Sequence, residues 1–212
     1  AALIPEEFGG AGLGLTEASI IMEEINRSGG NSGAVHGQMY NMSTLLRAGS
    51  TEQKKRYLPL IAAGKLRLQS MAVTEPTTGT DTTKLKTTAT RRGNHFVLNG
   101  QKVWTSRVQH SDLMLVLART TPLEECKRPT DGLSLFYTDL NRDFIEVREI
   151  HKMGRAAVDS NALFIDGLPI PAEDLIGEEG RGFEYILHGM NPERILIAAE
   201  AVGIGRAALD GG

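Results

Sequence analysis

Small hydroxyl side chains cluster in the segment of residues 71–81, and the only tryptophan of the chain, Trp104, lies in the segment of residues 99–106. Threonine hydroxyls offer hydrogen-bond donors, and Gly79 lets the backbone pass close to a ligand. The Trp104 ring could pack against a planar ring, and the hydroxyls of Thr105 and Ser106 could hydrogen-bond to it. Together the two segments predict a site for a planar cofactor such as a flavin.

Each segment also has a purely structural interpretation. Residues 71–81 fit a threonine-rich surface turn, because hydroxyl residues, proline and glycine are common in turns. Trp104 fits a core tryptophan equally well. Read separately, the two segments leave both interpretations open.

Glu193 is the carboxylate that we single out as a candidate base. Pro192 could open a helix at this point, and Leu196 and Ile197, three and four residues further on, provide no ion pair for the carboxylate. Glu193 therefore either faces solvent, where the helix dipole favours it, or lines a pocket.

The bulk composition excludes several classes of protein. A chain of 212 residues with 41% hydrophobic residues and a net charge of −3 is typical of a globular protein, and it has no basic stripe for nucleic acid. No apolar run is long enough to span a membrane, and no secretion signal is evident. The single cysteine, Cys126, indicates a reducing intracellular compartment, and the five histidines show no spacing that indicates a metal site, so we interpret them as incidental. Because the chain begins without Met and ends inside a helical pattern, we expect it to be part of a longer protein.

Residues 1–65 read as helices separated by glycines. Thr16 is predicted to cap a first helix that ends at Gly29 and Gly30. Its predicted apolar face is formed by Ile20, Ile21 and Ile25. A second helix is predicted to begin at Ser50, which has capping-box spacing to Gln53, and to break or restart at Pro59.

From about residue 66 to 177 the apolar pattern is that of strands. Short apolar or alternating runs occur at residues 96–98, 113–117, 133–137, 144–147 and 162–165. Asn99-Gly100 is predicted to form a type I′ turn between residues 95–98 and 101–104. We therefore expect an antiparallel barrel or sandwich, followed by a return to helix after Gly182.

Four segments, in this order, resemble the acyl-CoA dehydrogenase family, and the match runs along essentially the whole chain. The segments are residues 4–14 (IPEEFGGAGLG), 72–81 (AVTEPTTGTD), 98–106 (LNGQKVWTS) and 153–183. The fourth segment includes MGR at 153–155 and LFIDGLPIP at 163–171, and it ends in LIGEEGRGF. The sequence departs from the usual family pattern at Thr77-Thr78, where smaller residues are common, and at Ser106-Arg107.

The resemblance implies an α+β multidomain fold. It implies an N-terminal helical domain at residues 1–68, a middle antiparallel β-barrel or sandwich domain at 69–180, and at 181–212 the first helix of a C-terminal helical bundle. Family chains are longer at the C-terminus, so most of that bundle would lie outside this sequence.

The resemblance also implies an activity, the FAD-dependent α,β-dehydrogenation of an acyl-CoA thioester to a trans-2-enoyl-CoA. A carboxylate removes the α-proton while flavin N5 takes the β-hydrogen as hydride. The positions that match flavin contacts are Met71, Val73, Thr74, Gly79, Thr80, Trp104, Thr105 and Ser106. The positions that match substrate contacts are Thr80, Phe183, Leu187, Met190, Asn191 and Arg194.

Glu193 matches the catalytic base of one branch of the family. Isovaleryl- and long-chain-type members place the base on this helix and follow it with arginine, as Arg194 does here. Most other members place the base late in the C-terminal bundle, beyond residue 212. We assign Glu193 as the base, with a base beyond residue 212 as the alternative.

The expected partners follow from the same resemblance. They are an acyl-CoA substrate, an electron-transferring flavoprotein as electron acceptor, and further copies of the chain in a tetramer or dimer, in the bacterial cytoplasm or the mitochondrial matrix. No metal, nucleic acid or membrane span is expected. A same-fold flavin oxidase, of the acyl-CoA oxidase or nitroalkane-oxidase type, and a non-catalytic binding module stay open as alternatives.

Overall fold

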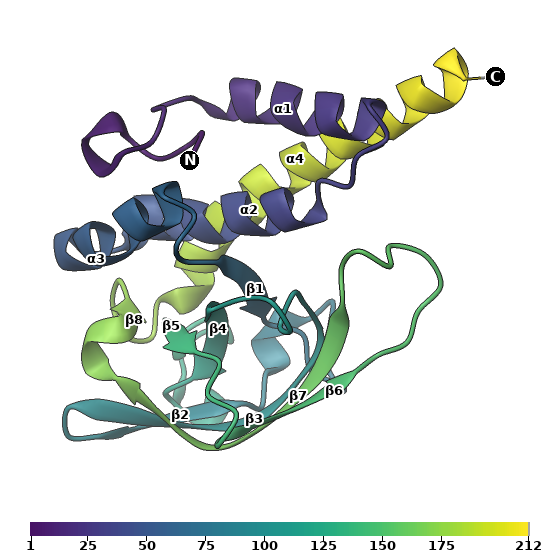
Figure 1. Cartoon of the computed structure of the whole chain (residues 1–212). Helices are drawn as coiled ribbons and strands as arrows, with labels where there is room; N and C mark the ends of the chain where they lie inside the picture. Colours follow the sequence, from purple (N-terminus) through teal and green to yellow (C-terminus); the bar gives the residue numbers. More distant parts are fainter. Residues whose placement is uncertain (212) are drawn as a thin grey trace.

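A computed structural model describes residues 1–211 and shows a layer of helices packed over a strongly curved β-sheet (Figure 1). The α-helices are α1 (Leu15–Arg27), α2 (Gly33–Ala48), α3 (Thr51–Ala62) and α4 (Gly182–Asp210). The short 3₁₀ helices are η1 (Glu6–Phe8), η2 (Thr82–Lys84), η3 (Leu123–Glu125) and η4 (Ala172–Asp174). The strands are β1 (Leu68–Ala72), β2 (Thr88–Arg92), β3 (His95–Ser106), β4 (Leu113–Arg119), β5 (Leu133–Asp139), β6 (Ile145–Glu149), β7 (Ser160–Pro171) and β8 (Leu175–Ile176).

The strands form one 8-stranded sheet in the order β6-β7-β3-β2-β4-β5-β8, with β1 paired to β4. All pairs are antiparallel except those that β1 and β2 make with β4. The predicted fold class, helices followed by an antiparallel β-domain and a further helix, is therefore confirmed, and the predicted strand segments are all strands. Among the helices of residues 1–211, none is both long and apolar enough to cross a membrane.

Strand β4 connects two apolar cores because both of its faces are buried. Leu113, Leu115 and Leu117 pack with α2, α3 and α4. Met114 and Val116, which alternate with them, pack inside the curve of the sheet. Since side chains alternate along a strand, the continuous apolar run in β4 serves both cores at once.

The predicted turn at Asn99-Gly100 is wrong. Strand β3 runs through both residues, and its pairing with β7 shifts between Leu98 and Gly100, which marks a β-bulge. The hairpin turn lies at Gly93, where β2 meets β3 and the backbone has φ 62°. Asn99 instead uses its side-chain Oδ1 to accept a hydrogen bond from the Gly167 amide at 2.8 Å.

Helix α1 begins before the predicted cap at Thr16. Gly14 is the N-cap, and its amide donates to the Glu17 carboxylate at 2.9 Å. The apolar face is also rotated from the prediction, because Ile20 is 56% exposed while Ala18 and Met22 are buried. The predicted stop at Gly29-Gly30 is confirmed.

The capping box of α3 is confirmed, but its break at Pro59 is wrong. Ser50 Oγ accepts from the Gln53 amide at 3.1 Å, and Gln53 Oε1 accepts from the Ser50 amide at 2.9 Å. The helix then runs through Pro59 to Ala62.

Two further features of the helices differ from the sequence analysis. Helix α2, which lies between the two predicted N-terminal helices, was not predicted as a separate element. Pro192 does not open a helix, because it lies in the interior of the continuous 29-residue α4. Glu193 is therefore a mid-helix residue, held at a fixed position between α2 and the sheet.

Candidate functional site

The two segments predicted to form one site lie side by side. The Val103 amide donates to Thr74 O at 2.9 Å, which joins the threonine-rich loop to β3. Ser70 Oγ, one strand residue before Met71, donates to Ser106 O at 3.0 Å. The end of β1 and the end of β3 therefore form one continuous surface.

A buried ion pair fixes the base of the threonine-rich loop. Lys102 Nζ lies 3.0 Å from Glu75 Oε1, and neither side chain is more than 3% exposed. The same carboxylate accepts hydrogen bonds from the amides of Lys86 and Thr87 at 2.7 and 2.9 Å. Burial alone would raise the pKa of Glu75, but the Lys102 ammonium and these donors together hold that pKa below its usual value. Burial lowers the pKa of Lys102 to about 8, so the pair is ionic at pH 7.

The backbone at the end of β3 is strained. Trp104 and Arg107 have φ angles of 61° and 62°, a left-handed conformation that non-glycine residues rarely adopt. The pairing of β3 with β7 shifts between Lys102 and Thr105. As a result the Trp104 side chain is turned outward and is 59% exposed, so the alternative of a core tryptophan is wrong. Thr105 is buried, and its hydroxyl has no hydrogen-bond partner within the described chain.

A cavity of about 370 Å³ lies between α2, α4, the ends of β1 and β3, and the loop that joins β6 to β7. Two of the predicted site residues, Ser106 and Glu193, both line it. The other lining residues are Gly33, His36, Gly37, Tyr40, Gln69, Arg107, Lys152, Met153, Gly154, Arg155, Val158, Ser160 and Ile197. The cavity thus brings the end of β3, which is predicted to bind a cofactor, and the candidate base Glu193 to one space.

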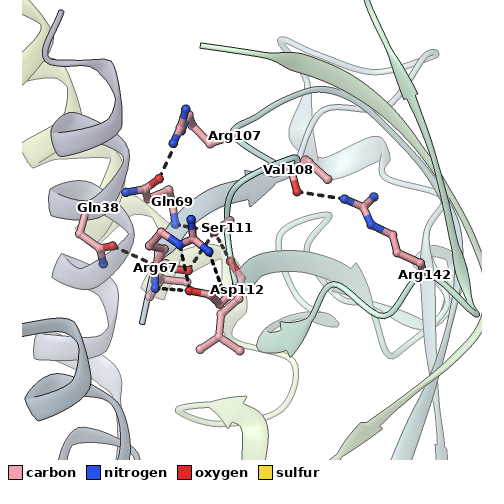
Figure 2. A network of polar contacts seen from close by, with 10 residues as sticks. Gln38, Arg67, Gln69, Arg107, Val108, Ser111, Asp112 and Arg142 are labelled. Carbon is pink, nitrogen blue, oxygen red and sulfur yellow. Dashed lines mark hydrogen bonds and ion pairs between the residues drawn. The ribbon is translucent and has the colours of Figure 1, made fainter. Parts of the chain in front are cut away.

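A polar network holds one wall of this cavity in place (Figure 2). Arg107 Nε donates to the side-chain Oε1 of Gln69 at 3.2 Å, and the backbone amide of Gln69 donates to Ser111 Oγ at 2.8 Å. Arg67 and Asp112 form a two-pronged ion pair beside it, with Nη2 to Oδ1 at 3.0 Å and Nε to Oδ2 at 3.2 Å. Because bidentate pairs fix geometry as well as charge, the start of β1 is tied firmly to the start of β4.

His36, the histidine that lines this cavity, is not among the site residues predicted from the sequence. His36 is 5% exposed on α2, its Nδ1 lies 3.1 Å from Glu200 Oε1, and its Nε2 lies 3.9 Å from Glu193 Oε1. The histidines are interpreted as incidental from the sequence, but His36 lines the same cavity as Glu193. One signal was present in the sequence, since Glu193 and Glu200 are seven residues apart and share a helix face. Because α2 is not predicted from the sequence, no predicted element packs against the helix face that carries Glu193 and Glu200.

The Tyr40 ring lies against His36, with ring centroids 5.0 Å apart in an edge-to-face arrangement. Burial first, and then the charge of Glu193, raise the pKa of Tyr40 to about 12. The phenol therefore stays protonated at neutral pH.

The other predicted site residues lie outside this cavity. Asn191 and Arg194 are exposed on α4, where Arg194 Nη1 donates to Asn191 Oδ1 at 2.9 Å. Gly79 and Thr80 are exposed, Thr74 and Leu187 are partly buried, and four apolar residues pack on the core between helices and sheet. Those four are Met71, Val73, Phe183 and Met190.

Comparison with known proteins identifies the family. Residues 1–65 match the family description "Acyl-CoA dehydrogenase, N-terminal domain", and residues 70–168 match "Acyl-CoA dehydrogenase, middle domain". The chain is 32% identical to cyclohex-1-ene-1-carbonyl-CoA dehydrogenase of Syntrophus aciditrophicus (strain SB), over 98% of this chain and 50% of the relative. It is 30% identical to mitochondrial isovaleryl-CoA dehydrogenase of Pongo abelii, over 97% of this chain and 49% of the relative.

A solved structure gives the same result for the fold. The glutaryl-coenzyme A dehydrogenase in complex with glutaryl-CoA superimposes with a TM-score of 0.87 and 33% identity, over 98% of this chain and 53% of that chain. This chain spans about half the length of the curated relatives it matches. The paired family matches and the shared architecture show that the chain belongs to the acyl-CoA dehydrogenase family.

Proposed function

We propose that the protein containing this chain catalyses FAD-dependent α,β-dehydrogenation of an acyl-CoA thioester to a trans-2-enoyl-CoA. The observation that carries the proposal is the cavity of about 370 Å³ that both Glu193 and Ser106 line. In this cavity a carboxylate on a rigid helix faces the strained end of the strand that matches the flavin segment of the family.

Glu193 is the proposed base because its carboxylate is free to take a proton. Its side chain is 32% exposed, and within residues 1–211 the only group at ion-pair distance from it is the His36 imidazole, at 3.9 Å. The mid-helix position of Glu193 on α4 gives it a fixed direction toward the cavity.

The residues at the end of β3 fit a flavin. The exposed ring of Trp104 and the unpartnered hydroxyl of Thr105 are the features that a planar ligand with several hydrogen-bonding atoms would satisfy. We propose that FAD is held by Met71, Val73, Thr74, Gly79, Thr80, Trp104, Thr105 and Ser106. When bound, FAD supplies the hydride acceptor of the reaction.

The substrate residues proposed from the family match are Thr80, Phe183, Leu187, Met190, Asn191 and Arg194. Five of them share α4 with Glu193, and of these five, four precede Glu193 by two to ten residues and Arg194 follows it directly. The exposed Asn191–Arg194 pair offers polar groups to the CoA portion, and the apolar residues offer a surface to the acyl chain. We propose an electron-transferring flavoprotein as electron acceptor, a dimer or tetramer as the assembly, and a bacterial cytoplasm or mitochondrial matrix as the location.

The Glu193→Gln variant tests the proposal. The native protein with its bound flavin is titrated anaerobically with a panel of acyl-CoAs of different chain length, and flavin absorbance is followed. We expect the native protein to bleach with at least one acyl-CoA. The variant keeps the flavin but bleaches slower by about 10³-fold, because the base contributes on the order of 10²–10⁴.

Glu184→Gln is the matched control. Glu184 lies in the first turn of the same helix, is exposed, and pairs with Arg181 at 2.7 Å instead of facing the cavity. This variant should bleach at the native rate. If Glu193→Gln also bleached at the native rate, the base would lie elsewhere, and if no acyl-CoA bleached the native protein, the proposed reaction would be wrong.

A further inference from the structure

His36 lies between two carboxylates of one helix. Its Nδ1 is 3.1 Å from Glu200 Oε1 and its Nε2 is 3.9 Å from Glu193 Oε1. On the basis of the proposed function, we propose that His36 is a positioning residue for the Glu193 carboxylate. Glu200 orients its ring so that Nε2 accepts a hydrogen bond from Glu193 once that carboxylate has taken the substrate's α-proton.

The environment of Glu200 determines which ring nitrogen carries the hydrogen. Burial would raise the pKa of Glu200, but the neighbouring His36, Ser32 and Arg155 together bring that pKa below its usual value. Glu200 is therefore ionised at neutral pH, and because its Oε1 lies 3.1 Å from His36 Nδ1, we assign the ring hydrogen to Nδ1. In a neutral imidazole, Nε2 then carries a lone pair and no hydrogen.

That lone pair has no partner within the described chain. His36 Nε2 is completely buried and makes no hydrogen bond, although it points toward Glu193. A buried polar atom without a partner is costly, so such atoms are uncommon in native proteins. Hydrogen-bond contact with Glu193 needs His36 Nε2 and Glu193 Oε1 to approach by about 1 Å, and catalytic hydrogen bonds that are long in the free enzyme commonly tighten in the substrate complex.

The other groups around His36 do not compete for the proton. Tyr40, on the same helix, has its pKa raised to about 12 and stays a protonated phenol. Arg107 from the end of β3 and Lys152 and Arg155 from the β6–β7 loop are cations that only donate. Gln69 from β1 is neutral. Among the described groups that line the cavity, the proton is therefore left to the Glu193 carboxylate and the His36 imidazole, whose facing atoms lie 3.9 Å apart.

The proton balance of the step is simple. The α-carbon–hydrogen bond breaks and the proton goes to a Glu193 oxygen, while the β-hydrogen leaves with its electron pair to the oxidant of the proposed reaction. The new O–H of Glu193 donates to His36 Nε2, and the proton can move across to give an imidazolium between two carboxylates. The proton then passes from the imidazolium to solvent when product leaves.

The kinetic test uses a pair of substitutions at His36. Asparagine places its amide nitrogen near the position of Nδ1, so His36→Asn keeps a donor for Glu200 and removes the atom that faces Glu193. We expect its anaerobic bleaching by acyl-CoA to slow by about tenfold, the effect of one lost hydrogen bond, and to change its dependence on pH between 6 and 9. His36→Gln, which places an amide near the position of Nε2, should recover part of the rate. His110→Asn, at an exposed histidine outside the cavity, should behave as the native protein does.

A second measurement does not depend on turnover. Nitrogen-15 NMR of histidine-labelled protein should show His36 as the tautomer with hydrogen on Nδ1, and Glu193→Gln should shift its Nε2 signal. The opposite tautomer, or a His36→Asn variant with the native rate and pH profile, would overturn the inference. If no acyl-CoA bleaches the native protein, the proposed function fails, whereas the NMR result still decides whether His36 is arranged as described.

Discussion

Lys102 and Glu75 show how the fold holds the threonine-rich loop against β3. The Lys102 ammonium donates to Val73 O at 3.1 Å and Leu117 O at 2.8 Å in addition to its 3.0 Å contact with Glu75. Each hydrogen of the Lys102 ammonium therefore has an acceptor, in a buried site that excludes water. Two charges buried together are tolerated because each satisfies the other and the remaining hydrogen-bonding groups are satisfied by backbone.

Replacing only one member of this pair should be costly. Lys102→Met leaves the Glu75 carboxylate buried without a cation, and we expect it to lower the free energy of unfolding by about 3–5 kcal/mol. The double variant Lys102→Met/Glu75→Gln removes both charges and keeps an acceptor for the backbone amides, so it should recover a large part of the loss. Urea unfolding followed by circular dichroism measures both. A double variant as unstable as the single one would mean that the pair acts through packing and not through charge.

Sequence reasoning located Glu193 but not His36, and the reason is physical. Glu193 is identified by its neighbours along the chain, so a motif is enough to find it. The importance of His36 arises only when α2 packs on α4, and its Tyr40 and Gly37 neighbours give no apolar period that predicts that contact. The strain at Trp104 and Arg107 is hidden for a similar reason, because positive φ angles at non-glycine residues have no sequence signal.

Helix α4 is positioned by close approach of its glycines to neighbouring backbones. A Cβ on Gly203 would meet Glu23 O at 2.2 Å, an atom of the α1 backbone. A Cβ on Gly189 would meet Thr44 Oγ1 at 2.5 Å on α2. Since α4 carries both Glu193 and Glu200, these contacts fix the positions of the two carboxylates along the helix axis relative to His36.

Two glycines of α4 therefore respond oppositely to the same substitution. Gly203→Ala forces the α1 and α4 backbones apart, and we expect a loss of about 1–3 kcal/mol in the free energy of unfolding. At Gly205, two residues away, an added Cβ would meet no atom of residues 1–211 within 4 Å. Gly205→Ala should gain about 0.5–1 kcal/mol because alanine favours helix over glycine. Thermal and urea unfolding compare the two, and equal effects would show that α1 does not pack on α4 as closely as described.

The elements were predictable to the extent that their signals are local. The apolar runs of the strands and the Ser50–Gln53 capping box depend on residues close in sequence, and both are confirmed. The turn at Asn99-Gly100 was wrong because β3 pairs on one edge with β2 and on the other with β7, and the bulge needed there also favours glycine. Pro59 and Pro192 did not end their helices because tertiary packing of α3 and α4 outweighs one missing hydrogen bond.

The helical layer and the sheet share a core, so we expect them to unfold as one unit. Leu115 of β4 and Tyr137 of β5 pack in the same cluster as Leu58 of α3 and Ile186 of α4. Tyr137 also donates its hydroxyl hydrogen to Asn41 O of α2 at 2.9 Å. The helix, strand, helix order was predictable from periodicity, but this shared core was not, because it joins residues nearly a hundred positions apart.

Gln53 is the polar link that tests this cooperativity. Its Nε2 donates to Glu173 O and Leu175 O at 2.8 and 2.9 Å, so α3 is joined to the segment that leads into β8. Gln53→Ala leaves two carbonyls without donors and removes half of the capping box. We expect a loss of about 2–4 kcal/mol, the sum of a cap and the unmet hydrogen bonds. Ser50→Ala, the control, removes only the cap and should cost about 1 kcal/mol.

The probe of cooperativity is a comparison of two signals during unfolding of native, Ser50→Ala and Gln53→Ala proteins. Far-ultraviolet circular dichroism follows mainly the helices, and near-ultraviolet circular dichroism follows the buried rings of Tyr57 and Tyr137, which sit at the shared core. The two curves should coincide in all three proteins, because loss of the helical layer exposes the sheet face of β4 and β5. If the helix signal of Gln53→Ala were lost well before the tyrosine signal, the helices would form a separate unit. The cavity between them and the sheet would then open independently of the core.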